Sequence, residues 1–164
     1  MRISVAADHN GYELKNEIAE ILKQNGHEVI DIGPHSMDPL DDYPDYAKPL
    51  ANSVSTGDTE RGIMVCGSGV GASVAANKVK GVRAAVCHDV SSAHQGVEHD
   101  DMNVLCLGSR IVGSEVVREL VSAFISAEYT NEERHARRLS KVIQMENDLE
   151  CTNQYMGAHL ILLV

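Results

Sequence analysis

The 164-residue sequence lacks several features, and each absence excludes a class of protein. It has no Trp and one Phe, so a folded core must be built from aliphatic side chains. Its four Cys residues are widely spaced and form no CxxC pair, which is typical of reduced cytosolic thiols rather than of a disulfide scaffold. No run approaches the roughly 18 apolar residues that a membrane-spanning helix needs. No charged-then-apolar secretion segment follows Met1.

Basic residues are also scarce, with 14 Lys and Arg against 24 Asp and Glu and a formal net charge of −10. This balance argues against binding to nucleic acid or to an anionic membrane. It does not exclude an anionic small molecule, because a few Arg residues can dominate one cleft. We therefore expect a cytoplasmic globular protein without nucleic-acid or membrane partners.

Short apolar runs alternate with amphipathic stretches along the chain. Runs typical of buried strands cover residues 3–7, 28–32, 62–66, 83–87 and 103–107. Helical periodicity covers about residues 14–25, 46–54, 116–124 and 132–149, with further helices from the glycine-rich stretch to about residue 77 and between the last two strands. The Pro- and Asp-rich residues 34–44 are interpreted as a loop.

This order predicts an α/β fold, a single doubly wound (Rossmann-like) domain whose five-stranded parallel sheet carries helices on both faces. We place the domain at residues 1–150. Residues 151–164 form a tail whose apolar end, His159–Val164, would pack on the domain or on a partner subunit.

The end of the third strand carries the main chemical motif, Cys66 followed by the glycine-rich stretch Gly67–Gly71. Ligands of doubly wound sheets bind beyond the carboxyl ends of the strands. Glycines there let backbone N–H groups converge on an anion, and a thiol at the start of a helix ionises readily enough to act as a base. Cys66 is equally well interpreted as a small buried residue. A dinucleotide-binding loop is disfavoured, because this loop follows the third strand rather than the first.

Polar residues follow two other strands. Asp8 and His9 come after the first strand, where a His could donate to phosphate or assist ring opening, or be an ordinary surface group. His99 and Asp100 precede the fifth strand, and we expect them at the same edge of the sheet. The spacing of His94 and His99 does not match a helical metal pair, so no metal site is expected.

Three arginines are candidates for binding phosphate. Arg134 and Arg138 are four residues apart on a predicted helix and share a face, which suits either a phosphate clamp or a solvated surface. Arg110 follows the fifth strand and adds a third cation. Cys87 and Cys106 lie within strands and are interpreted as core residues.

Taken in order, these motifs resemble the family of ribose-5-phosphate isomerase B and the galactose-6-phosphate isomerase subunits. The resemblance runs from Ile3 to about Asn147. Its carriers are Ala7-Asp8-His9-Asn10-Gly11 with Leu14-Lys15, Asp42-Tyr43-Pro44-Asp45-Tyr46-Ala47, Cys66-Gly67-Ser68-Gly69-Val70-Gly71 with Ala75-Ala76-Asn77-Lys78, Glu98-His99-Asp100, Asn103-Val104-Leu105, Gly108-Ser109-Arg110, Arg134-His135 and Arg138.

The resemblance implies an aldose–ketose isomerase of sugar phosphates that works through an enediolate, without metal or other cofactor. It also implies a homodimer, or a tetramer built from it, with active sites at the subunit interface. Ribose 5-phosphate is the first expected substrate. The alternatives are allose 6-phosphate, galactose 6-phosphate or a tetrulose phosphate, or a non-catalytic sugar-phosphate binding subunit.

The resemblance also implies a role for each site residue. Cys66 is the base, Ser68 assists at the substrate oxygens, and the amides of Gly67, Gly69, Val70 and Gly71 form the anion hole. His99 opens the sugar ring from the partner subunit with Asp8 nearby, Tyr43 lies in the active-site loop, and His9, Arg110, Arg134 and Arg138 bind phosphate. Asp100 stands where many members have Asn, and Met102 replaces a small polar residue, so both bear on the identity of the sugar.

Overall fold

The computed structural model describes the backbone of residues 1–160 and the side chains of residues 1–148. The chain forms two compact units, Met1–Tyr129 and the segment from Thr130 onward, and each is described by itself.

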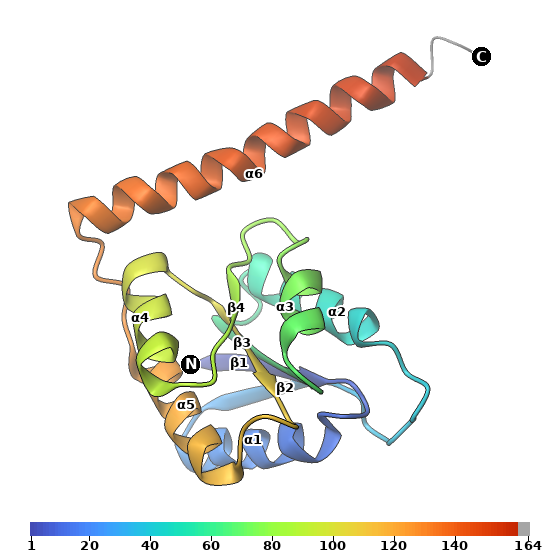
Figure 1. Ribbon diagram of the computed structural model, residues 1–164, viewed down its shortest axis with the longest axis vertical. Coiled ribbons are helices and arrows are strands. Elements are labelled where there is room, and N and C mark those ends of the chain that lie inside the picture. Colours follow the sequence, from blue (N-terminus) through green and yellow to red (C-terminus); the bar gives the residue numbers. More distant parts are fainter. Residues whose placement is uncertain (161–164) are drawn as a thin grey trace. The chain divides into compact units, whose positions relative to one another are not determined.

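The first unit is built on a parallel sheet (Figure 1). Its strands are β1 (Arg2–Ala7), β2 (Glu28–Gly33), β3 (Arg61–Cys66), β4 (Ala84–Val86) and β5 (Val104–Gly108). They lie in the order β2-β1-β3-β5-β4, and every neighbouring pair is parallel. The central strands β3 and β5 are almost wholly buried, which explains why their sequences are continuously apolar rather than alternating. The predicted five-stranded parallel sheet is confirmed.

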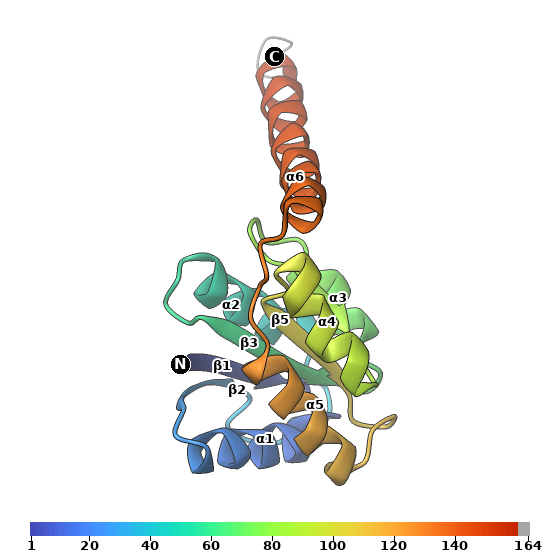
Figure 2. The same cartoon turned by 90° about the vertical axis from the view of Figure 1, so that its left-hand side faces the viewer.

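Helices cover both faces of this sheet (Figure 2). On one face, α1 (Tyr12–Gln24), α4 (Val90–Asp100) and α5 (Ser114–Ser126) pack with the side chains of Ile3, Val5, Ile63, Leu105 and Leu107. On the other, α2 (Tyr43–Ser55) and α3 (Val70–Ala76) pack on Ala6, Met64, Val104 and Cys106. Alternate residues of each strand therefore belong to different cores, as the predicted doubly wound architecture requires.

The second helix begins earlier than the sequence indicates. Helix α2 starts at Tyr43, inside the segment predicted to be a loop to residue 44. The physical reason is that Pro44 occupies the first turn, where its missing N–H is not needed, and the extended Asp42 precedes it as N-cap. The loop assignment was therefore wrong at its end, and Tyr43 is held by a helix.

The second unit consists largely of α6 (Glu133–Leu160). This helix is longer than the predicted span of about 132–149, and its backbone continues past the boundary predicted at residue 150. The apolar end His159–Val164 lies outside the residues whose side chains are described. Among the described residues, none of the helices combines the length and the apolar character that crossing a membrane requires.

Candidate active site

Strand register brings three functional positions into one row. Ala7 of β1 pairs with Val65 of β3, and Cys66 pairs with Gly108 of β5. Asp8, Cys66 and Ser109 therefore leave the sheet beside one another at its carboxyl edge. The sequence continues from β1 to β2 on one side, while β3 lies on the other side, so this is the topological switch point where open α/β sheets bind ligands.

A cavity of about 340 Å³ opens at this edge. Its walls come from the ends of β1, β3 and β5 and from the starts of α2 and α3. The lining residues are Asp8, Tyr43, Cys66, Gly67, Ser68, Gly71, Arg110 and Ile111. The structure thus brings together the sequence-predicted residues Asp8, Tyr43, Cys66, Ser68 and Arg110.

Cys66 lies at the end of β3 with its residue only 4% exposed. The backbone N–H of Gly69 donates to its Sγ at 3.1 Å. Gly69 has φ +81° and a Cβ there would lie 3.1 Å from the carbonyl carbon of Leu107. Only glycine therefore allows the loop to turn this N–H toward the sulfur.

The other two described cysteines have a different chemical character. Burial raises the pKa of Cys87 to about 11, with a further contribution from Asp89. Burial also raises the pKa of Cys106, and the neighbouring Cys66 and Cys87 add to that shift. Both thiols stay protonated near neutral pH, which agrees with their interpretation as core residues and leaves Cys66 as the candidate base among the three.

The ring of Tyr43 lies beside Gly71, at the end of the glycine-rich stretch that follows Cys66. A Cβ on Gly71 would lie 2.9 Å from the Tyr43 ring, so the absence of a side chain at residue 71 lets the ring pack against α3. Ser68 is exposed, and its Oγ accepts a hydrogen bond from the Val70 N–H at 3.4 Å. Both hydroxyl-bearing residues thus lie at the mouth of the cavity, one from each helix start.

Asp8 is 5% exposed and stabilises the turn after β1. Its Oδ1 accepts hydrogen bonds from the backbone N–H groups of Asn10 and Gly11, at 2.9 Å and 3.2 Å. This carboxylate also lines the cavity. It therefore shapes the loop that carries His9 and faces the substrate space at the same time.

His9 belongs to a row of polar side chains that ends at Arg110. Its Nδ1 lies 2.7 Å from Oδ1 of Asp41, and its Nε2 lies 2.8 Å from Nδ2 of Asn10. The Asn10 Oδ1 in turn accepts a hydrogen bond from Nη2 of Arg110 at 2.5 Å. The hydrogen bond that the His9 ring makes to Asp41 raises the pKa of His9; burial opposes this shift, and the charges of Asp8 and Asp41 add to it. Two predicted phosphate binders are thus connected by groups that the sequence did not single out.

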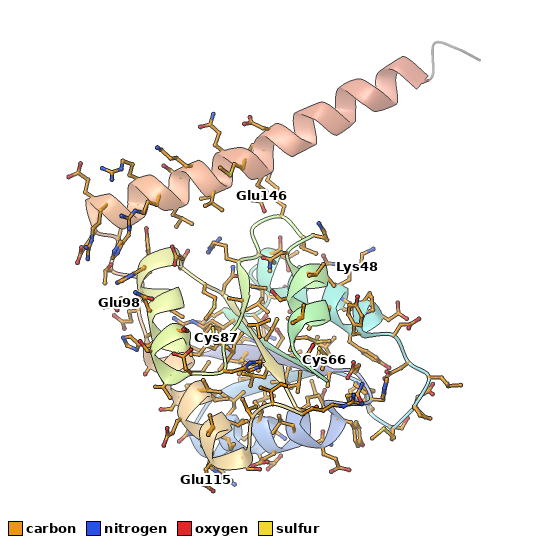
Figure 3. All side chains as sticks on the ribbon, viewed as in Figure 1. Lys48, Cys66, Cys87, Glu98, Glu115 and Glu146 are labelled. Atoms are coloured by element: carbon orange, nitrogen blue, oxygen red, sulfur yellow. The ribbon has the colours of Figure 1, made fainter. Side chains whose placement is uncertain are left out.

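His99 and Asp100 lie elsewhere in the chain's own fold. They end α4, which runs back from the carboxyl edge to the start of β5, so they lie at the amino edge of the sheet. Figure 3 shows their neighbour Glu98 well away from Cys66. The expectation that His99 shares the edge of Cys66 is wrong within one chain, because a helix between parallel strands must return the chain to the opposite edge. Met102 is buried in the core against Gly96. The replacement of a small polar residue by Met at this position therefore affects packing.

The two remaining predicted arginines lie on α6. Arg134 and Arg138 are both exposed, and Arg134 makes an ion pair with Glu132 at 3.0 Å. Since α6 belongs to the second unit, their place at the cavity stays a prediction. Within the part of the chain that the structure describes, no three His, Cys, Asp or Glu side chains are grouped closely enough to hold a metal ion.

Comparison with known proteins decides the family. Residues 3–142 match the model of the family described as Ribose/Galactose Isomerase. The chain belongs to this family. It is 43% identical to ribose-5-phosphate isomerase B of Escherichia coli, over 88% of this chain and 96% of the relative.

Solved structures of the family have the same fold. Ribose-5-phosphate isomerase B of Clostridium thermocellum matches with a TM-score of 0.88 and 44% identity, over 91% of this chain and 99% of that one. The enzyme from Mycoplasma genitalium, solved with bound ribulose-5-phosphate, matches with a TM-score of 0.84 and 43% identity, over 89% and 96%. As in other members of the ribose/galactose isomerase family, the sheet and helices here form an α/β fold.

Sequence reasoning missed Asn10 and Asp41 as parts of the site of this family member. The sequence motif contains Asn10 next to His9 but assigns it no role. Asp41 is one of several acidic residues in the segment before Tyr43, and no spacing rule distinguishes it from Asp38 or Asp42. The contact with His9 becomes visible only in three dimensions.

Proposed function

We propose that this protein is an aldose–ketose isomerase of phosphorylated sugars, with ribose 5-phosphate and ribulose 5-phosphate as its first substrate pair. The observation that best supports this proposal is the environment of Cys66. Cys66 lines a cavity of about 340 Å³ together with Arg110, and its sulfur accepts the Gly69 N–H at 3.1 Å. A base beside N–H donors and a cation suits proton abstraction next to a carbonyl.

The chemical step follows from this arrangement. The Cys66 thiolate takes the proton from C2 of the open-chain aldose, and the electron pair of that C–H bond forms the C1–C2 double bond of an enediolate. The same thiol then returns the proton to C1, and C2 becomes the ketone carbon. Backbone N–H groups of Gly67, Gly69, Val70 and Gly71 support the negative oxygen, and Ser68 assists proton movement between the two oxygens. A positioned base contributes about 10²–10⁴-fold in rate, and preorganised donors add several kcal/mol.

Ring opening precedes this step and needs a second acid–base group. We assign it to His99, with Asp8 nearby and Asp100 contacting the sugar hydroxyls. Because His99 and Cys66 lie at opposite edges of one sheet, the assignment requires the His99 of a second copy of this chain. The proposal therefore includes a homodimer with shared active sites.

The phosphate end of the substrate is assigned to the cationic residues. His9 and Arg110 lie beside the cavity, and Arg134 and Arg138 present two exposed guanidinium groups four residues apart on α6. Tyr43 closes the side of the cavity near Gly71. The cytoplasm is part of the proposal as well, since Cys66, Cys87 and Cys106 are all free thiols.

The deciding experiment measures isomerisation of ribose 5-phosphate in EDTA beside allose 6-phosphate, galactose 6-phosphate and tetrulose phosphates. We expect ribose 5-phosphate to be converted, and Cys66→Ala to lose about a thousandfold or more in kcat while still binding the product. Cys87→Ala is the matched control and should keep its turnover, because this thiol lies outside the cavity lining.

Other outcomes have definite meanings. Conversion of only another sugar would move the substrate assignment and keep the mechanism. Turnover that survives in Cys66→Ala would remove Cys66 as base, and loss of activity in EDTA would favour a metal. A folded dimer that binds these sugars and converts none would be the non-catalytic binding subunit.

A further inference from the structure

We propose that Asp41 and Asn10 are positioning residues that couple phosphate binding at His9 to the uptake of one proton by its imidazole ring. The inference rests on the proposed function in one respect, namely that His9 and Arg110 hold the phosphate group of the substrate. It adds a defined resting state of the ligand-free site and a change of protonation when the anion binds.

The direction of the hydrogen bonds follows from Arg110. A guanidinium group only donates, so the Asn10 atom that faces it at 2.5 Å must be the accepting Oδ1. The other end of the Asn10 amide is then the donating Nδ2, which lies 2.8 Å from Nε2 of His9. Nε2 must therefore accept, and the ring proton is on Nδ1, which donates to Asp41 Oδ1 at 2.7 Å. With these contacts intact, His9 is neutral.

An anion requires the opposite state at Nε2. A phosphate oxygen is an acceptor, so His9 contacts it through an Nε2–H group. Once Nε2 carries a proton, it and Nδ2 of Asn10 are both donors, and their contact is lost. Because Nδ1 keeps its proton to donate to Asp41 Oδ1, the proton on Nε2 comes from solvent, and binding of a fully ionised anion forms an imidazolium.

Asp41 makes this proton uptake favourable. Its side chain is 6% exposed, and its Oδ1 accepts from both the backbone N–H and Nδ1 of His9. A carboxylate with so little access to water is stabilised when the ring beside it becomes positive. Asp8 adds a second negative charge near the ring. The side chain of Asn10 lies between the ring and the positively charged Arg110. Tyr46 also lies beside Asp41, whose charge adds to burial in raising the Tyr46 pKa.

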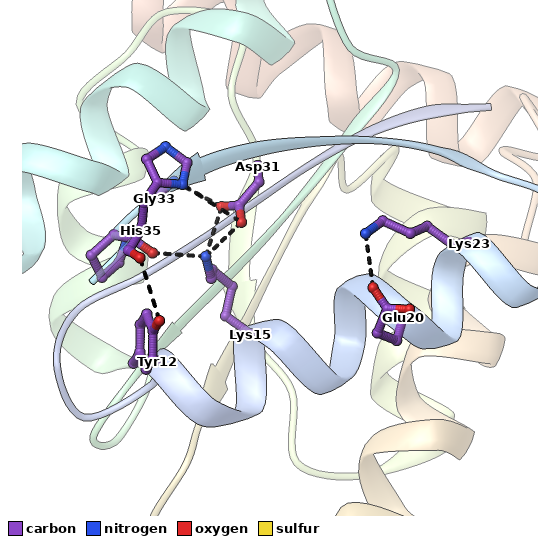
Figure 4. Close-up of polar contacts among 8 residues, drawn as sticks. Tyr12, Lys15, Glu20, Lys23, Asp31, Gly33 and His35 are labelled. Carbon is purple, nitrogen blue, oxygen red and sulfur yellow. Dashed lines mark hydrogen bonds and ion pairs between the residues drawn. The ribbon is translucent and has the colours of Figure 1, made fainter. Parts of the chain in front are cut away.

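Asp41 is held in place from both ends of its loop. At the start, the buried Lys15 donates to both oxygens of Asp31 at 2.7 Å and to the carbonyl oxygen of Pro34 at 2.9 Å (Figure 4). At the other end, α2 begins at Tyr43, two residues after Asp41. The segment that carries Asp41 is therefore anchored at both ends by contacts within the chain.

The test measures proton uptake directly by calorimetry. Inorganic phosphate and the non-titrating anion sulfate are titrated into the full-length protein at several values between about pH 6 and pH 9, in buffers of different ionisation enthalpy. We expect uptake to rise toward one proton per site with increasing pH, and sulfate affinity to fall by up to about tenfold per pH unit above the ligand-free pKa of His9.

Two variants should act in opposite directions. Asp41→Asn keeps an acceptor for Nδ1 but removes the charge, so it should lower the pKa of His9 in nuclear magnetic resonance titrations and weaken sulfate binding by about tenfold near pH 8. Asn10→Ala removes the donor that stabilises the neutral ring, so it should raise that pKa. Asp42→Asn, which loses the same charge one residue away, should leave both quantities unchanged. A purely structural role would not produce shifts of opposite sign.

The result that overturns the inference is anion binding without proton uptake over the whole pH range, or a His9 pKa that is the same in Asp41→Asn. Failure to bind phosphate in a protein that isomerises sugar phosphates would also overturn it. The proposed function is tested separately by turnover. A protein that shows the proton linkage and isomerises no sugar would refute the proposed function and leave this inference standing.

Discussion

The two edges of the sheet carry different parts of the proposed site. The carboxyl edge holds Cys66 and the cavity, whereas the amino edge holds the end of α4 with His99. The register of β3 with β5 separates the edges by four residues, from the Gly62–Val104 pair to the Cys66–Gly108 pair, or roughly 13 Å of strand. The difference teaches that one protomer contains both residues proposed for the acid–base steps and holds them at opposite edges of its sheet. The proposed homodimer, in which a second copy supplies His99, accounts for this separation.

The largest effect is expected from mixing two inactive variants. Cys66→Ala and His99→Asn homodimers should each lose about a thousandfold in turnover. After unfolding and refolding together, half of the dimers contain one chain of each kind, and each such dimer has one site with both residues intact. The mixture should therefore recover about a quarter of the wild-type activity, measured with ribose 5-phosphate.

The control is Cys66→Ala mixed with a Cys66→Ala, His99→Asn double variant, which should stay inactive. No recovery in the first mixture, despite mixed dimers seen by native mass spectrometry, would mean that both residues act from the same chain. The comparison of the two edges would then lose its functional meaning.

A smaller effect is expected at the phosphate end of the substrate. Arg138→Ala should raise KM by about tenfold with little change in kcat, because a charge-assisted contact to phosphate contributes equally before and during the chemical step. Arg137→Ala, on another face of α6, is the matched control. An unchanged KM in Arg138→Ala would assign this helix face to solvent.

The smallest effect on catalysis is expected from a structural residue of the amino edge. Arg61 begins β3, and its guanidinium donates to the carbonyl oxygens of Phe124 and Ala127 at the end of α5. Removing these hydrogen bonds in Arg61→Ala should lower the free energy of unfolding by about 2 kcal/mol and leave kcat unchanged. Urea denaturation measures the loss, and Arg61→Lys, which cannot reach both oxygens, should restore less than half of it. A fall in kcat with unchanged stability would show that the amino edge acts on the chemistry within one chain.

The sheet could be predicted because its strands are continuously apolar and buried on both sides. The row of Asp8, Cys66 and Arg110 could also be predicted, since each residue follows a parallel strand. The prediction that His99 lies at the carboxyl edge was wrong. Helix α4 runs from the end of β4 back to the start of β5, and His99 lies at the end of this helix. The early start of α2 was missed because Pro44 resembles a loop residue and is also favoured in a first helical turn. Asp41 could not be found, because its partner His9 lies 32 residues away and nothing local distinguishes this aspartate.

The close approach of the Tyr43 ring to Gly71, which has no side chain, bears on the size of the cavity. A Cβ on residue 71 would lie 2.9 Å from the Tyr43 ring, so the start of α2 approaches α3 closely at this point. Tyr43 and Gly71 together form part of one wall of the cavity. Under the proposed function, the space beside Tyr43 bears on which sugar fits, whereas Cys66 at the end of β3 supplies the base.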